Sequence, residues 1–154
     1  MIDQVEGLAD LDRALGELPK STARGVLRRT GLFALEPFVA RWRAAAPVDA
    51  DPASSPNRAP GTYRDSVHAG TKLNRSQART ARREGKSFVE VYAGTNDPAG
   101  IQTEFGNAHQ SAQPHARPAW DASQNEVIER VGRGLWSEIA KAAERLARKA
   151  MKGR

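Results

Sequence analysis

The chain has 154 residues, of which 39% are hydrophobic, and it carries 24 Lys and Arg against 18 Asp and Glu. That length suits one domain with its own core, so we predict a single domain over residues 1–154. Because there is no Cys, a disulfide scaffold, a Cys-ligated metal and thiol catalysis are excluded. No apolar run approaches the ~18 residues that a membrane span needs, and the acidic start is unlike a signal peptide, so we expect neither a span nor secretion.

The charge is arranged in blocks. Residues 1–19 have a net charge of −4, whereas residues 20–47, 72–86 and 141–154 each have +5. Such blocks suit self-association or docking on oppositely charged partners. For any one block alone, a solvated helix face is the simplest interpretation.

The first part of the chain is predicted to be helical. Residues 8–18 form a short amphipathic helix that Pro19 ends, because apolar residues recur at helical spacing: Leu8, Leu11, Leu15 and Leu18. A longer helix follows from Ser21, which can cap it, to about Ala46. Pro37 lies inside this helix and has no N–H to donate, so we expect a bend or a break there.

The middle of the chain alternates loops and strands. Residues 47–61 contain four Pro and predict a long exposed loop. A strand is expected within residues 63–69, after a turn at residues 62–66. Residues 72–86 are basic and almost devoid of apolar side chains, which predicts a mobile arm between two strands. Residues 87–93 predict the second strand.

The last part is predicted to be helical again. Residues 99–105 form a short helix stopped by Gly106, and a long helix runs from Pro118 to about Lys149. Gly132 and Gly134 each cost about 1 kcal/mol relative to Ala inside a helix. The helix is therefore either weak at this point or packed closely on a neighbour.

No set of residues has the pattern of a catalytic or metal site. The spacing of the three His residues is not that of metal ligands on one helix, and no cluster of Cys or carboxylate residues lies beside them in the sequence. These residues are His68, His109 and His115. Glu90 and Glu104 could in principle pair as acid and base, but their spacing fixes no partnership. Glycine-rich phosphate loops are absent from the sequence. We expect no enzyme, no cofactor and no metal.

The order of the segments is more specific than any single motif. After the long helix comes Pro60-Gly61-Thr62-Tyr63-Arg64-Asp65-Ser66-Val67. Later come Ile101-Gln102-Thr103-Glu104-Phe105-Gly106 and Gln113-Pro114-His115-Ala116-Arg117-Pro118-Ala119. In this order the segments resemble the tail-completion family of long-tailed bacteriophages, which includes tail terminators and minor tail components. The resemblance extends from Leu8 to about Ala147, and Glu-Phe-Gly followed about ten residues later by Arg-Pro-Ala is its most specific part.

The resemblance implies an α+β fold, a small antiparallel β-sheet packed against two or three helices, among them a long bent helix before the sheet and a long C-terminal helix. It also implies a structural protein without an active site, which forms an oligomeric ring, typically of six copies, at the head–tail junction of a phage or a phage-like gene transfer particle. The implied partners are further copies, the tail-tube protein and the head connector or stopper proteins. Genomic DNA would pass through the lumen without specific binding, and the protein would be assembled in the bacterial cytoplasm and reside in the neck of the virion.

Two groups of candidate residues follow from this pattern. The structural motif comprises Gly61, Ser66, Glu104, Phe105, Gly106, Pro114, Arg117, Pro118 and Ala119. The basic arm, which is expected to serve assembly, comprises Arg75, Arg79, Arg82, Arg83 and Lys86. Within the motif we expect a corner in which Phe105 is core, Gly106 has a backbone conformation awkward for other residues and Glu104 pairs with Arg117.

Two other classes of function remain open. A nucleic-acid-binding module would use the arginines of the basic arm, although the arm has no aromatic residue for base stacking. A hydrolase would use Glu90 or Glu104 and has the least support. A ring that forms without nucleic acid would favour the structural protein, and a monomer with steeply salt-dependent DNA affinity would favour the binding module.

Overall fold

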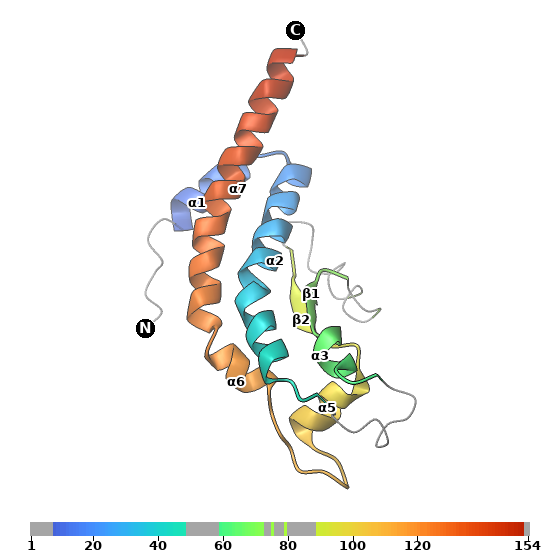
Figure 1. Ribbon diagram of the computed structural model, residues 1–154. Helices are drawn as coiled ribbons and strands as arrows, with labels where there is room; N and C mark the ends of the chain where they lie inside the picture. The colour runs from blue at the N-terminus through green and yellow to red at the C-terminus, as the bar shows by residue number, and fades with distance from the viewer. Residues whose placement is uncertain (1–7, 49–58, 73–74, 76–78, 80–88, 153–154) are drawn as a thin grey trace. The chain divides into compact units, whose positions relative to one another are not determined.

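The computed structural model describes residues 8–48, 59–72, 75, 79 and 89–152. The fold is α+β, as predicted: it is mostly helical, with a small antiparallel sheet and a long C-terminal helix (Figure 1). The chain divides into two compact units, of which the first comprises Met1–Phe33, Thr71–Glu90 and Glu129–Arg154. The second comprises Ala34–Gly70 and Val91–Ile128. Helices α2 (Lys20–Ala45) and α7 (Gln124–Lys152) each contribute to both units.

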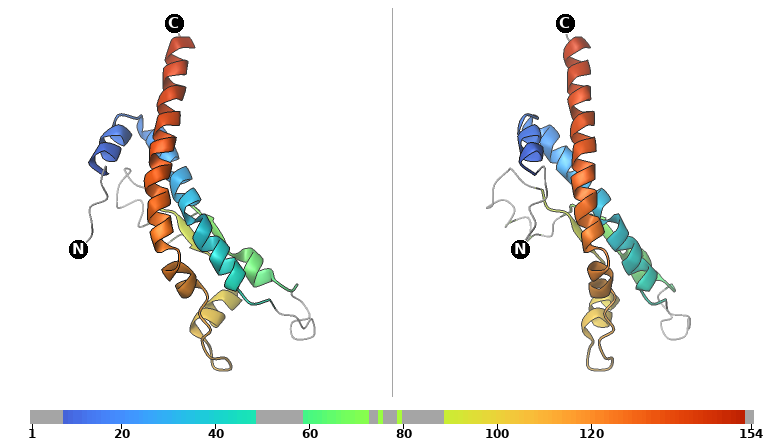
Figure 2. Two further views of the ribbon diagram at one scale, coloured as in Figure 1. Left: turned by 60° about the vertical axis from the view of Figure 1, so that its left-hand side comes forward. Right: turned by 90° about the vertical axis from the view of Figure 1, so that its left-hand side faces the viewer.

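The core of the first unit is made by three helices. Helix α1 (Leu8–Gly16) packs beside the second half of α7 (Figures 1 and 2). The predicted leucine face of α1 contributes to a cluster of buried or partly buried residues: Leu11, Ala14, Leu15, Leu18, Val26, Leu135, Ile139 and Ala142. In every view the last turns of α7 extend beyond α1 (Figure 2).

The second unit contains the sheet, which is smaller than the sequence indicates. Strands β1 (His68–Gly70) and β2 (Tyr92–Gly94) pair antiparallel, with Ala69 opposite Ala93. The strand predicted over 87–93 is thus wrong in extent; residues 87 and 88 lie outside the described residues, and 89–91 are not in a strand.

The first predicted strand also starts too early, because helix α3 (Thr62–Ser66) occupies its beginning. The cause lies in the side chains of this segment. Ser66 Oγ donates to the carbonyl of Tyr63 at 2.7 Å, which closes the helical turn. The ring of Tyr63 is buried, and its hydroxyl accepts a hydrogen bond from Nε1 of Trp42 at 2.9 Å.

Aromatic contacts hold this core together. The ring of Phe38 lies 5.5 Å from that of Trp42 and 5.3 Å, edge to face, from that of Trp120. The other buried hydrophobic residues of the unit come from α2, α3, α6, α7 and the segments that join them: Ala34, Leu35, Val39, Ala46, Val67, Ala119 and Val127.

Helix α2 runs unbroken through Pro37, so the alternative of a break is wrong. Pro37 leaves the carbonyl of Phe33 without its helical donor. The Nη1 atom of Arg130, on α7, lies 3.5 Å from this carbonyl oxygen. A side chain from a second helix thus takes the position of the missing N–H.

The predicted C-terminal helix is two helices, α6 (Ala116–Asp121) and α7. The break is at Ser123, whose N–H donates to the carbonyl of Trp120 rather than continuing the α-helical pattern. Its hydroxyl, fully buried, donates to the carbonyl of Ala119 at 2.6 Å and accepts from Arg41 at 3.0 Å. Side-chain bonds of Ser to nearby backbone compete with helix formation, which explains the break. Across the described ranges, no helix is long and apolar enough to cross a membrane.

Candidate functional site

The Glu104 corner, formed by Glu104, Gly106 and residues 115–117, is a densely bonded polar site in the second unit. Helix α5 (Pro98–Phe105) begins with Asp97 as its N-cap, which accepts from the N–H of Ala99 at 2.9 Å. Glu104 lies in the last turn of this helix, and its side chain is only 9% exposed. Asp97 thus fixes the start of α5, and Glu104 lies at its other end, next to Gly106.

The carboxylate of Glu104 accepts four hydrogen bonds. Three come from consecutive backbone N–H groups of His115, Ala116 and Arg117, at 2.8, 3.0 and 3.2 Å, and the fourth from Nε of Arg117 at 3.2 Å. The predicted pairing of Glu104 with Arg117 is thereby confirmed. The three N–H groups belong to the start of α6, where no helical acceptor exists, so Glu104 satisfies them across the loop.

The ionisation of Glu104 follows from these contacts. Burial alone would raise its pKa, but the hydrogen bonds from the backbone of Ala116, His115 and Arg117 and from the Arg117 side chain hold the pKa below its usual value. A carboxylate that is ionised and fully bonded is a structural cap. It is poorly suited to exchange protons as a general acid or base near neutral pH.

Gly106 ends α5 in a conformation that few other residues adopt. Its φ is 76° and its ψ 176°, which agrees with the conformation predicted for a glycine at this corner. Its N–H closes the helix on the carbonyl of Gln102 at 2.8 Å, and the following loop returns to α5 where the N–H of Gln113 donates to the carbonyl of Thr103 at 2.7 Å.

The prediction that Phe105 is core is wrong. Its side chain is exposed, at 68%, and lies with Ile101, at 66%, on one side of α5. The guanidinium of Arg117 lies 5.1 Å from the centre of the Phe105 ring. The corner is therefore closed by the polar bonds of Glu104, and Phe105 remains available to a partner.

We expect Phe105→Ala to lower the free energy of unfolding by less than about 1 kcal/mol, since only an exposed cation–π contact is lost. Urea denaturation of the two proteins measures this difference. A loss of about 3–5 kcal/mol, as for a buried Phe, would show that the ring is part of the core.

The remaining motif residues lie in the same unit. Gly61 precedes α3 with a φ of 80°, and Ser66 Oγ also lies 2.5 Å from Oγ1 of Thr95, next to β2. Ala119 is buried, whereas Pro114 and Pro118 are exposed. Gly61, Ser66 and Ala119 thus support the local fold.

The basic arm is described only in part. Arg75 and Arg79 have helical backbone geometry and exposed side chains, while Arg82, Arg83 and Lys86 lie outside the described residues. Whether the arm is mobile stays a prediction. In the described part of the chain, no group of three or more His, Asp or Glu is placed to hold a metal ion.

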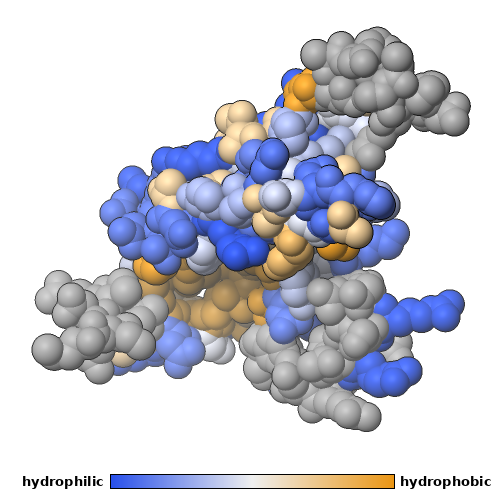
Figure 3. Space-filling model, turned by 90° about the horizontal axis from the view of Figure 1, so that it is seen from below, coloured by the Kyte–Doolittle hydropathy of each residue, from blue (hydrophilic) through white to orange (hydrophobic). Residues whose placement is uncertain are grey.

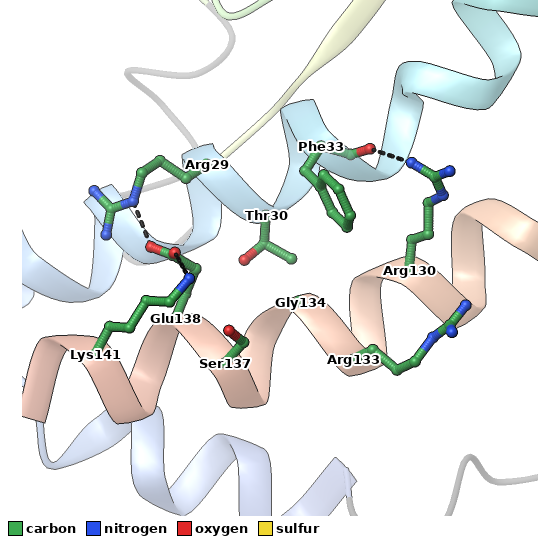
Figure 4. A pocket seen from close by; sticks show the side chains of 9 residues that line it. All are labelled: Arg29, Thr30, Phe33, Arg130, Arg133, Gly134, Ser137, Glu138 and Lys141. Atoms are coloured by element: carbon green, nitrogen blue, oxygen red, sulfur yellow. Dashed lines mark hydrogen bonds and ion pairs between the residues drawn. The ribbon is translucent and has the colours of Figure 1, made fainter.

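The first unit contains a pocket of about 550 Å³ between α2 and α7, which the sequence analysis missed (Figure 4). Arg29, Glu138 and Lys141 lie at one end and Arg130 and Arg133 at the other (Figure 4). Between them are four further residues from the two helices: Thr30, Phe33, Gly134 and Ser137.

The ends of the pocket differ in how tightly their charges are paired. Nε of Arg29 lies 2.5 Å from Glu138, and this contact lowers the pKa of the Glu138 carboxyl. Lys141 lies 3.4 Å from the same carboxylate. At the other end the Arg130 guanidinium lies 5.0 Å from the centre of the Phe33 ring. Gly134, which lowers helix stability relative to Ala, faces Thr30. A Cβ added at Gly134 would lie 3.1 Å from Cγ2 of Thr30.

No protein-family model, curated protein or solved structure matches this chain.

Proposed function

We propose that the protein is a structural subunit of a phage or phage-like particle, which assembles with further copies into a ring at the head–tail junction. The observation that carries the proposal is the Glu104 carboxylate, which is saturated by three backbone N–H groups and Arg117. Glu104 and Arg117 belong to Glu-Phe-Gly and Arg-Pro-Ala, the two tripeptides that are the most specific part of the resemblance to tail-completion proteins. Their geometry is that of a fixed corner, which suits a scaffold rather than a reaction site.

Exposed apolar side chains support the assembly part of the proposal. Large hydrophobic residues reach the surface of both units, and Figure 3 shows orange hydrophobic residues among blue hydrophilic ones. In the second unit Ile101 and Phe105 are four residues apart on α5 and so share a face. Exposed apolar side chains that gather on one face are typical of protein interfaces.

A ring needs a heterologous interface, in which one face of a copy contacts a different face of the next. The acidic residues 1–19, together with the basic residues 20–47 or 141–154, give the chain regions of opposite charge that can serve such an interface. Partners in the proposed neck are the tail-tube protein and the head connector, and DNA would pass without specific contacts.

The oligomeric state without nucleic acid tests the proposal. We expect the purified full chain to form closed rings, seen by negative-stain electron microscopy and weighed by native mass spectrometry. Phe105→Ala should weaken assembly while leaving the fold intact, because it removes an exposed apolar side chain. Val48→Ala, at another exposed apolar position, is the matched control.

A monomer that binds DNA would contradict the ring and support the nucleic-acid-binding module. In that case affinity should fall steeply with salt, and Arg75→Gln with Arg79→Gln should reduce the slope of log affinity against log salt by about 2. A monomer without DNA affinity would overturn both proposals.

A further inference from the structure

The pocket between α2 and α7 in the first unit is rich in hydrogen-bond donors. Four cationic side chains line it, Arg29, Arg130, Arg133 and Lys141, against the single carboxylate of Glu138. Two hydroxyl groups, of Thr30 and Ser137, lie between the charged ends (Figure 4). A site with many donors and few acceptors is complementary to an oxyanion.

Thr30 provides the second, independent observation. The residue is only 2% exposed, and its Oγ1 is buried without a hydrogen-bond partner. Figure 4 shows its side chain pointing from α2 toward α7, with the hydroxyl on the side of Ser137 and Glu138. Folded proteins satisfy nearly all buried polar groups, so an unpartnered hydroxyl in the wall of a pocket points to an acceptor that a ligand supplies.

The cations differ in their freedom to contact a ligand. Arg29 is held by Glu138 at 2.5 Å and forms part of the wall. Lys141 is 63% exposed and 3.4 Å from Glu138, and Arg133 is 74% exposed and 3.5 Å from Glu129. Such long, exposed ion pairs are weak, so these two side chains can turn toward an anion with little loss.

We propose that this pocket binds a phosphate group, with the hydroxyl of Thr30 as a donor in the wall and Lys141 and Arg133 balancing the charge. A volume of about 550 Å³ suits a small ligand or one projecting group. The Phe33 ring, 45% exposed beneath Arg130, gives the site an aromatic side on which the organic part of a phosphate ester can lie. The inference goes beyond the proposed role in the neck and does not depend on it.

Calorimetric titration of the full chain with inorganic phosphate, at constant ionic strength kept with chloride, tests the site. We expect saturable binding to wild type and about tenfold weaker binding to Thr30→Val, because a hydrogen bond to a charged ligand is lost. Thr30→Val keeps size and charge, and the free variant should be no less stable than wild type because the hydroxyl it loses is unpartnered. Thr30→Ser should restore binding.

A second pair of variants tests the contribution of positive charge to phosphate binding. Lys141→Gln should also weaken binding, by about two- to fivefold, whereas Lys149→Gln, an exposed cation of the same helix outside the pocket, should leave the affinity unchanged. If Thr30→Val fails to fold, the difference in phosphate affinity between Lys141→Gln and Lys149→Gln still tests the site. Unsaturable binding in wild type, wild-type affinity in folded Thr30→Val, or equal losses in the two Lys variants would overturn the proposal.

The source of the phosphate is decided by competition. A short DNA duplex that displaces inorganic phosphate from wild type, and that binds Thr30→Val less tightly, would assign the site to the nucleic-acid backbone. A duplex that leaves phosphate binding unchanged would assign it to free phosphate or a small ester. Either result requires the pocket to bind phosphate first.

Discussion

Replacing Glu104 with Ala should lower the free energy of unfolding by about 3–5 kcal/mol, because the substitution leaves three backbone N–H groups without their acceptor and removes the carboxylate that Nε of Arg117 contacts. The N–H groups of His115, Ala116 and Arg117 stand at the start of α6, where no other acceptor lies within the helix. Urea denaturation, followed by circular dichroism, measures the loss.

Two control variants separate the contribution of the Glu104 charge from that of its hydrogen-bonding shape. Glu104→Gln keeps one acceptor oxygen and should lose part of the stability that Glu104→Ala loses. Glu129→Gln changes an exposed carboxylate, 70% accessible, whose contact with Arg133 is 3.5 Å long, and should cost less than about 0.5 kcal/mol. A loss below about 1 kcal/mol for Glu104→Ala would contradict the role of Glu104 as the centre of the corner.

Stability should also depend on pH through Glu104. Its pKa in the folded protein lies below the unfolded value of about 4.3, so the unfolded state binds more protons in this range and stability rises with pH. The contribution is complete above about pH 4.3 and is lost as the pH falls through the folded pKa. Glu104→Gln should therefore show a shallower loss of stability on acidification than wild type. Equal acid dependence of the two proteins would contradict this assignment.

The helices are the part of the fold that local sequence patterns predict. The spacing of Leu11 and Leu15 predicts α1, and the apolar positions of α2 predict its length, because a 3.6-residue period needs no knowledge of distant partners. The strands are shorter than predicted: among the described residues, 89–91 have strand composition but are not part of a strand. Strand extent depends on pairing, which is not local.

Other differences have the same physical origin. Ser123 breaks the C-terminal helix with help from Arg41, 82 residues away, and the pocket is closed by Arg29 and Glu138, 109 residues apart. No local pattern encodes such contacts. The spacing of Glu-Phe-Gly and Arg-Pro-Ala predicts a corner with Phe105 in the core, yet that spacing does not determine which side of α5 faces the rest of the unit, and Phe105 is exposed.

Gly106→Ala should lower the free energy of unfolding by about 2–6 kcal/mol, which combines backbone strain of about 1–3 kcal/mol with overpacking of similar size. At a φ of 76° and ψ of 176° an added Cβ would lie 2.8 Å from the N atom of Ala112 and 2.9 Å from the carbonyl oxygen of Gln110. Both atoms are backbone, so the loop must move and with it the approach of residues 115–117 to Glu104.

Gly132→Ala is the matched control: space is open around Gly132 in α7, so the same change should stabilise by up to about 1 kcal/mol. Urea denaturation of both variants tests the difference in sign, and a Gly106→Ala protein as stable as wild type would show that the corner does not require glycine.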